Sequence, residues 1–161
     1  MRKTNIIDDL ILEMRLDVDD KTLIEKVESL ENIDLPDSGG MTLLSAACIY
    51  DRLEIAKKLI ELNANVNVQY EKANNFTALH AAVANGKIDA VKLLLLNHAN
   101  PNLQDKWGNI ALLRAKSYDL EIIKLLLKYG SDCNLQNFYG NSSYNAFAAF
   151  PEVIKLLNGE E

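Results

Sequence analysis

One pattern of about 33 residues recurs along the chain, and this periodicity limits the fold more than any other feature of the sequence. Its clear copies read MTLLSAACIYDRLEIAKKLIELNANVN, NFTALHAAVANGKIDAVKLLLLNHANPN and NIALLRAKSYDLEIIKLLLKYGSDCN. The position of Thr42 in the first copy returns at Thr77, Ile110 and Ser142, at separations of 35, 33 and 32 residues. Self-similarity with a period of about 20 to 50 residues is typical of folds built from stacked units.

Each copy carries the apolar spacing of two helices. In LEIAKKLIEL the apolar side chains recur on one helical face, and IDAVKLLLL repeats that face in the next copy. We therefore interpret the run Leu93 to Leu96 as core and not as a docking motif. Gly86 and Gly130 stand where a helix ends in a left-handed residue. Two such helices cannot bury their apolar faces alone, so we expect the copies to stack on one another.

These copies resemble the ankyrin repeat, whose signature T-P-L-H-x-A lies within a unit of about 33 residues. The resemblance covers about residues 33 to 157 and implies an all-α solenoid of stacked helix-turn-helix units with short β-turn fingers. It also implies that His80, at the histidine of the signature, ties its turn together by hydrogen bonds. The chain departs from the family pattern because no copy has the proline, only one has the histidine, and the turn from Tyr70 to Asn75 is two residues longer.

We predict a single ankyrin repeat domain over residues 1–161. Its predicted parts are an N-terminal cap at 1–36, repeats at 37–69, 70–104 and 105–136, and a shortened C-terminal cap at 137–161. The N-terminal cap is predicted as a pair of helices within residues 4 to 31. The first of them has a stripe of apolar residues: Ile6, Ile7, Leu10, Ile11 and Met14.

The sequence offers little for chemistry. Its two histidines, His80 and His98, have no cysteine, aspartate or glutamate at metal-ligand spacing, so we assign both a structural role. Cys48 and Cys133 stand apart, which suits a reducing compartment. There is no nucleophile elbow and no phosphate-binding glycine loop. We therefore predict a protein that is not an enzyme and that needs no cofactor and no metal.

The net charge of -6 is unevenly distributed. Residues 1 to 40 hold 11 acidic and 5 basic residues, whereas residues 41 to 161 hold 12 of each. This balance argues against nucleic acid and anionic membranes as partners and favours a protein with a basic surface. The chain has no apolar run of about 20 residues, and its start, MRKTNIIDDLILEM, becomes acidic where a signal peptide would be apolar. We therefore expect a cytoplasmic protein.

Repeated polar and aromatic residues mark the turns between copies. Asn67, Asn102 and Asn134 follow each second helix, where we interpret them as turn-stabilising residues. The resemblance implies that fingers and first helices form a concave binding face, and tyrosine and tryptophan often carry binding energy. The predicted partner-binding residues are Tyr50, Tyr70, Phe76, Lys106, Trp107, Tyr118, Phe138 and Tyr139. Alternatively, some of these aromatic residues stack on one another and stiffen the fingers.

The resemblance and the absent chemistry together predict a protein–protein binding module that acts through this concave face. An alternative is a cytoplasmic inhibitor or immunity protein that blocks a basic toxin enzyme such as a nuclease, since complementary charge accelerates encounter. A further alternative is an adaptor that links several proteins at moderate affinity. We expect the free protein to be a monomer.

Overall fold

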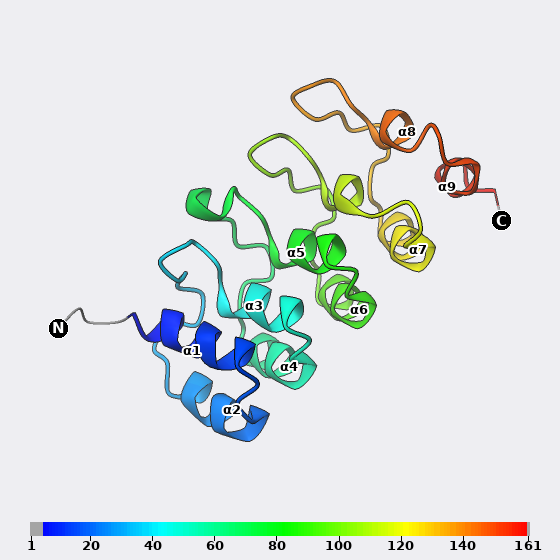
Figure 1. The fold of residues 1–161 in the computed structure, drawn as a ribbon. Coiled ribbons are helices and arrows are strands. Elements are labelled where there is room, and N and C mark those ends of the chain that lie inside the picture. The colour runs from blue at the N-terminus through cyan, green and yellow to red at the C-terminus, as the bar shows by residue number, and fades with distance from the viewer. Residues whose placement is uncertain (1–4, 161) are drawn as a thin grey trace.

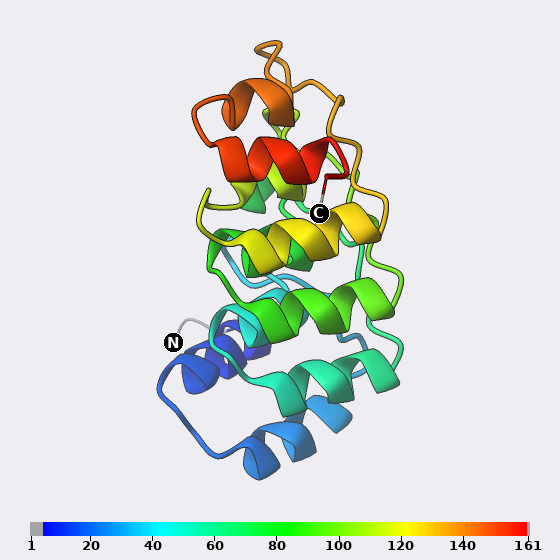
Figure 2. The ribbon, with the colours of Figure 1, turned by 90° about the vertical axis from the view of Figure 1, so that its right-hand side faces the viewer.

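The computed structural model describes residues 5–160 and shows the expected all-α solenoid (Figure 1). Helices follow one another in pairs, and the first and second members of the pairs form two rows. The first row consists of α1 (Ile6–Arg15), α3 (Leu43–Ile49), α5 (Ala78–Ala84), the 3₁₀ helix η2 (Ala111–Arg114) and α8 (Ser143–Ala146). The second row consists of α2 (Asp20–Glu28), α4 (Leu53–Glu61), α6 (Ile88–Leu96), α7 (Leu120–Lys128) and α9 (Pro151–Leu157). Figure 2 shows the second row stacked in chain order.

Before each later member of the first row, the chain forms an extended turn that we call a finger. Finger 1 spans residues 29–42, finger 2 spans 62–77, finger 3 spans 97–110 and finger 4 spans 129–142. The fingers project together from one side of the helical stack (Figure 1). The two extra residues of finger 2 are accommodated by a short 3₁₀ helix, η1 (Glu71–Ala73). Within the part of the chain that the structure describes, the only bridge of β type joins Pro36 and Thr42.

Threonine side chains cap the first helices of the first two repeats, and the third repeat lacks such a cap. Thr42 and Thr77 each accept a hydrogen bond from the backbone N–H three residues later. Ile110 holds the equivalent position and makes no side-chain cap, and the chain is one residue shorter before the following helix. The pattern predicts two helices in every repeat, but here the first is only the four-residue 3₁₀ helix η2.

A continuous apolar core runs between the two rows of helices. It includes the fully buried side chains Ile7, Met14, Leu23, Leu43, Ile55, Leu59, Leu79, Leu94, Ile110, Leu112, Ile122 and Ile123. Two predictions about the core are wrong in detail. Ile6 is 55% exposed and does not belong to the buried stripe of the first helix, and Leu96 is 61% exposed at the end of its leucine run. Both residues lie at helix termini, where apolar neighbours cover only one side.

The side chains of Asn67 and Asn102 connect neighbouring repeats, whereas the side-chain bonds within their own turns are accepted by Asn65 and Asn100. The Asn67 side chain donates to the carbonyl of His98 (3.2 Å) and accepts from the N–H of Asn100 (2.8 Å). Asn102 makes the same two bonds to Gly130 and Asp132 one repeat later. Each pair satisfies backbone groups at the end of the next second helix, which fixes the spacing between units.

The acidic residues of the N-terminal cap also make contacts within the chain. Arg52 forms ion pairs with Asp17 (2.7 Å) and Asp20 (3.0 Å), and it donates to the carbonyl of Met14. Lys58 pairs with Glu28 at 2.5 Å. The first repeat therefore supplies two cations that neutralise part of the cap and attach it to α4.

Candidate protein-binding surface

The predicted contact residues fall into two groups at opposite ends of the first-row helices. Six of them lie in the fingers: Tyr70, Phe76, Lys106, Trp107, Phe138 and Tyr139. The other two, Tyr50 and Tyr118, lie at the far ends. Tyr50 caps the C-terminus of α3 and packs against the core. Tyr118 was expected at the end of a helix, but η2 stops at Arg114, so this side chain lies in the following loop and is 72% exposed.

Finger 4 carries the most accessible aromatic side chains of the fingers. Phe138 and Tyr139 are each 72% exposed. The turn that holds them is set by Asn137, whose side-chain oxygen accepts from the N–H groups of Tyr139 (2.9 Å) and Asn141 (3.0 Å). The N–H of Phe138 donates to the carbonyl of Trp107 in finger 3 (3.0 Å), so the position of this exposed pair is fixed by its neighbour.

The aromatic residues of fingers 2 and 3 are half-buried, and two of them contact one another. Tyr70 donates its hydroxyl to the carbonyl of Asp34 at 2.8 Å. Phe76 stacks on His80 with 5.5 Å between ring centres, and Trp107 meets Phe76 edge-on at 6.3 Å. The stacking alternative therefore describes this pair of fingers, and a role of these side chains in binding stays a prediction.

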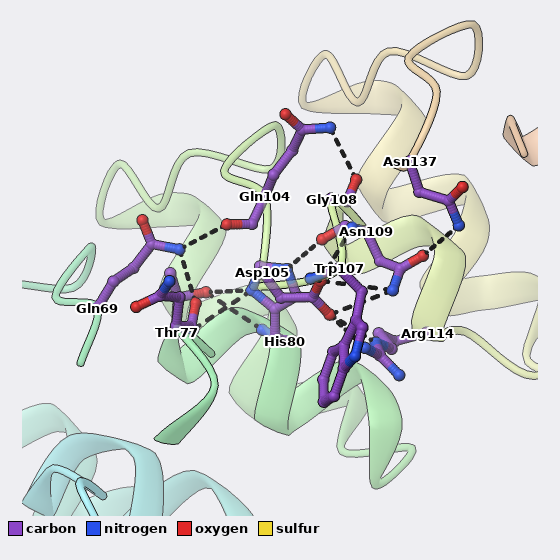
Figure 3. A network of polar contacts seen from close by, with 11 residues as sticks. Gln69, Thr77, His80, Gln104, Asp105, Trp107, Gly108, Asn109, Arg114 and Asn137 are labelled. Atoms are coloured by element: carbon purple, nitrogen blue, oxygen red, sulfur yellow. Dashed lines mark hydrogen bonds and ion pairs between the residues drawn. The ribbon is translucent and has the colours of Figure 1, made fainter. Parts of the chain in front are cut away.

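A buried ion pair organises finger 3, as Figure 3 shows. The carboxylate of Asp105 accepts from the N–H groups of Trp107 (2.8 Å) and Asn109 (2.9 Å) and pairs with Arg114 of η2. The Cζ atom of Arg114 lies 4.8 Å from the Phe76 ring centre and 5.2 Å from that of Trp107. Arg114 thus joins fingers 2 and 3, because cations are attracted to aromatic faces.

The charge of Asp105 is maintained by these bonds. Burial alone raises the pKa of a carboxyl group, but the hydrogen bonds from Arg114, Asn109 and Trp107 outweigh burial and hold the pKa of Asp105 below its ordinary value. Arg114 was not among the predicted contact residues. The sequence does contain a signal for it, because an arginine stands where the preceding repeat has the small residue Ala81.

His80 has the structural role that the resemblance implies. Its Nδ1 atom lies 2.9 Å from Oγ1 of Thr77, and its Nε2 atom lies 3.0 Å from the carbonyl oxygen of Asn109 in the next repeat. Because Thr77 also donates its N–H to Nδ1 (3.3 Å), the neutral ring with hydrogen on Nε2 fits both contacts. Burial lowers the pKa of His80, although the bond to Asn109 favours the protonated form.

We expect His80 to make stability depend on pH below neutrality. An unfolded histidine titrates near pH 6.5, whereas the folded pKa is lower, so protons bind preferentially to the unfolded chain. The stabilisation is complete above about pH 6.5 and is lost as the pH falls through the folded pKa. The melting temperature should therefore fall more between pH 7 and pH 5 in the parent than in His80→Gln. Equal decreases in the two proteins would contradict this assignment.

A groove lies between fingers 1 and 2 and the helices α3 and α5. Its volume is about 290 Å³. Its apolar lining comes from Met41, Ile49, Phe76 and Ala81, and its polar lining includes Asp37, Ser45, Lys72 and Asn74. The fingers approach closely here, because a side chain at Gly40 would place its Cβ atom 2.6 Å from the backbone nitrogen of Ala73. The missing side chain at Gly40 therefore lets the backbones of the two fingers meet beside the groove.

Comparison with known proteins agrees with this geometry. The family model described as ankyrin repeats (3 copies) matches residues 18–105 and 79–160. The chain belongs to the ankyrin repeat family. Ankyrin repeats are in general protein–protein interaction modules and are in general not enzymatic.

Several curated proteins share this repeat region. A candidate E3 ubiquitin-protein ligase of Arabidopsis thaliana, XBAT34, is 35% identical over 83% of this chain and 35% of its own length. The protein p28 of Saccharomyces cerevisiae, named as a candidate regulatory subunit of the 26S proteasome, is 32% identical over 73% of this chain and 53% of its own. The ankyrin repeat protein L371 of Acanthamoeba polyphaga mimivirus is 32% identical over 78% of this chain and 16% of its own. The chain thus spans about half or less of these relatives.

Two other kinds of feature are absent from residues 5–160. Within residues 5–160, no three side chains of histidine, cysteine, aspartate or glutamate lie together as metal ligands would. Over the same residues, none of the helices has the length and apolar character needed to cross a membrane.

Proposed function

We propose that this ankyrin repeat domain binds another protein through the face formed by its fingers and first-row helices. The observation that carries the proposal is the pair Phe138 and Tyr139, both 72% exposed on a turn of fixed shape. Large exposed aromatic side chains are uncommon on free surfaces and are enriched among residues that dominate binding energy. A rigid turn also reduces the conformational entropy lost on binding.

A finer proposal is that the partner is basic and that the protein inhibits it, as an immunity protein blocks a toxin nuclease. The excess of acidic residues in positions 1 to 40 supports this idea, because complementary charge accelerates association. The ion pairs of Arg52 and Lys58 with the cap reduce that excess at the first repeat. An adaptor with several partners is the competing proposal. A single basic partner that dissociates as salt increases would favour inhibition.

The proposed face is tested by two substitutions of equal exposure. The partner is first captured from source cells with the whole chain and identified by mass spectrometry. Tyr139→Ala should then weaken its binding by about 2 kcal/mol, which is typical of a central aromatic anchor, with an unchanged melting temperature. Tyr118→Ala is the matched control, because Tyr118 is equally exposed at the opposite end of the first-row helices.

The two variants locate the surface whichever way the result falls. Loss of affinity in Tyr139→Ala alone supports the finger face. Loss in Tyr118→Ala alone would place the partner on the edge away from the fingers and would contradict the proposal. Parent affinity in both variants would exclude both aromatic sites. Binding is measured by isothermal titration calorimetry on the purified partner.

A further inference from the structure

The groove between fingers 1 and 2 has a counterpart one repeat later that the chain itself fills. One residue before the threonine position stands Met41 in finger 1 and Phe76 in finger 2. Three residues before that position stands Asn74 in finger 2 and Trp107 in finger 3. The second pair of fingers therefore presents Phe76 and Trp107 where the first pair presents Met41 and Asn74. In that second space lies Arg114, with its guanidinium carbon within about 5 Å of both rings.

One position decides whether the space is open. Arg114 stands four residues after Ile110, and Ala81 stands four residues after Thr77. Ala81 is a small residue that lines the open groove, whereas Arg114 extends across the equivalent space in the next repeat. The fold therefore gives a direct example of the side chain that this kind of space accommodates.

We propose that the groove between fingers 1 and 2 binds an arginine side chain of a partner protein. The apolar stem of the arginine lies against Met41, Ile49 and Phe76. Its guanidinium group pairs with the carboxylate of Asp37, which lines the groove. This inference rests on the proposed function, because it supplies one anchor of the same finger face.

Charge at the groove favours a cation on the side of finger 1. The Oδ1 atom of Asp37 accepts from the N–H groups of Gly39 (2.9 Å) and Met41 (2.7 Å), so the carboxylate is held at the groove. Asp8 of α1 accepts from the N–H of Ser38 at 2.6 Å, which adds a second carboxylate to the same finger. These two negative charges complement an incoming guanidinium group.

Lys72 is the cation that opposes this charge. It lines the groove from finger 2, at the position where finger 3 has Asp105. Its side chain is exposed, so it can extend into water when the groove is occupied. Replacing this lysine by an acid reverses the only opposing charge of the lining and leaves the buried core untouched, which makes it a suitable test.

The probe is N-acetyl-arginine methylamide, titrated into the whole chain and followed by NMR at the methyl groups of Met41 and Ala81. N-acetyl-citrulline methylamide is the matched control, because it has the same length and shape without the charge. We expect saturable shifts with the arginine amide and roughly fivefold weaker binding of the citrulline amide, because the citrulline amide cannot make the charge-assisted contact with Asp37.

Two variants sharpen the test in opposite directions. Ala81→Arg should abolish the shifts, because it fills the groove as Arg114 fills its own space. Lys72→Glu should tighten binding of the arginine amide by roughly threefold, an effect typical of an exposed charge, and it stays informative if Ala81→Arg fails to fold.

Equal binding of the arginine and citrulline amides, or shifts that do not saturate, would overturn the proposal. Binding that is unaffected in Lys72→Glu would do the same, since the site would then lack the inferred charge. The titration contains no partner protein. Its failure would therefore remove the arginine anchor alone, whereas failure of the Tyr139→Ala test would remove the finger face itself.

Discussion

Replacing Leu94 by alanine should destabilise the protein by about 2 to 5 kcal/mol, the usual cost of removing a buried leucine side chain. Leu94 is fully buried on α6, a helix that packs against α4, α5 and α7. The cavity would therefore weaken contacts with both neighbouring repeats. Stacked repeats gain much of their stability at such interfaces, so the loss should be felt along the array. Urea denaturation followed by circular dichroism measures it.

The same helix provides the control. Leu96 lies two residues further on α6 and is 61% exposed, so Leu96→Ala should change the free energy of unfolding by no more than about 0.5 kcal/mol. The two substitutions delete the same atoms from one helix and differ only in burial. Equal free energies of unfolding in the two variants would contradict the burial of Leu94 between the repeats.

The periodic part of the fold could be predicted from the sequence because packing imposes the period. The helix pairs, the two rows and the role of His80 follow from apolar spacing and from the resemblance to the repeat. The incorrect predictions of burial share a physical reason. The burial of a residue depends on which other helices lie beside it, and the sequence of its own helix does not specify them. Ile6 and Leu96 fit an apolar stripe in sequence, but no other helix covers them.

The candidate site was harder to predict than the fold. Tyr139 and Trp107 occupy equivalent turn positions, yet one is exposed and the other contacts Phe76. The difference comes from Phe76 of finger 2 and from Arg114 of η2, which contact the Trp107 ring and lie outside finger 3. Contacts between fingers of successive repeats thus decide which aromatic side chains reach solvent, and a single repeat pattern does not encode them.

The ion pair beneath Trp107 allows a second strong prediction. Asp105→Ala should lower the free energy of unfolding by about 3 kcal/mol. It removes the acceptor of two backbone N–H groups and leaves Arg114, whose side chain is only 28% exposed, without its carboxylate. Breaking a buried pair from one side costs about 3 to 5 kcal/mol, and the access of Arg114 to water places this pair near the lower limit.

Finger 1 supplies the matched control for this prediction. Asp37 stands at the equivalent position and accepts from Gly39 and Met41, but among residues 5–160 it forms no ion pair. Asp37→Ala should therefore cost only about 1 kcal/mol, the usual contribution of a turn hydrogen bond. The difference between the two variants isolates the contribution of Arg114 and should shrink when Arg114→Ala is the background. Equal losses from Asp37→Ala and Asp105→Ala would mean that Arg114 adds nothing to finger 3, and that other contacts join fingers 2 and 3, such as the hydrogen bond from the N–H of Lys106 to the carbonyl of Asn74.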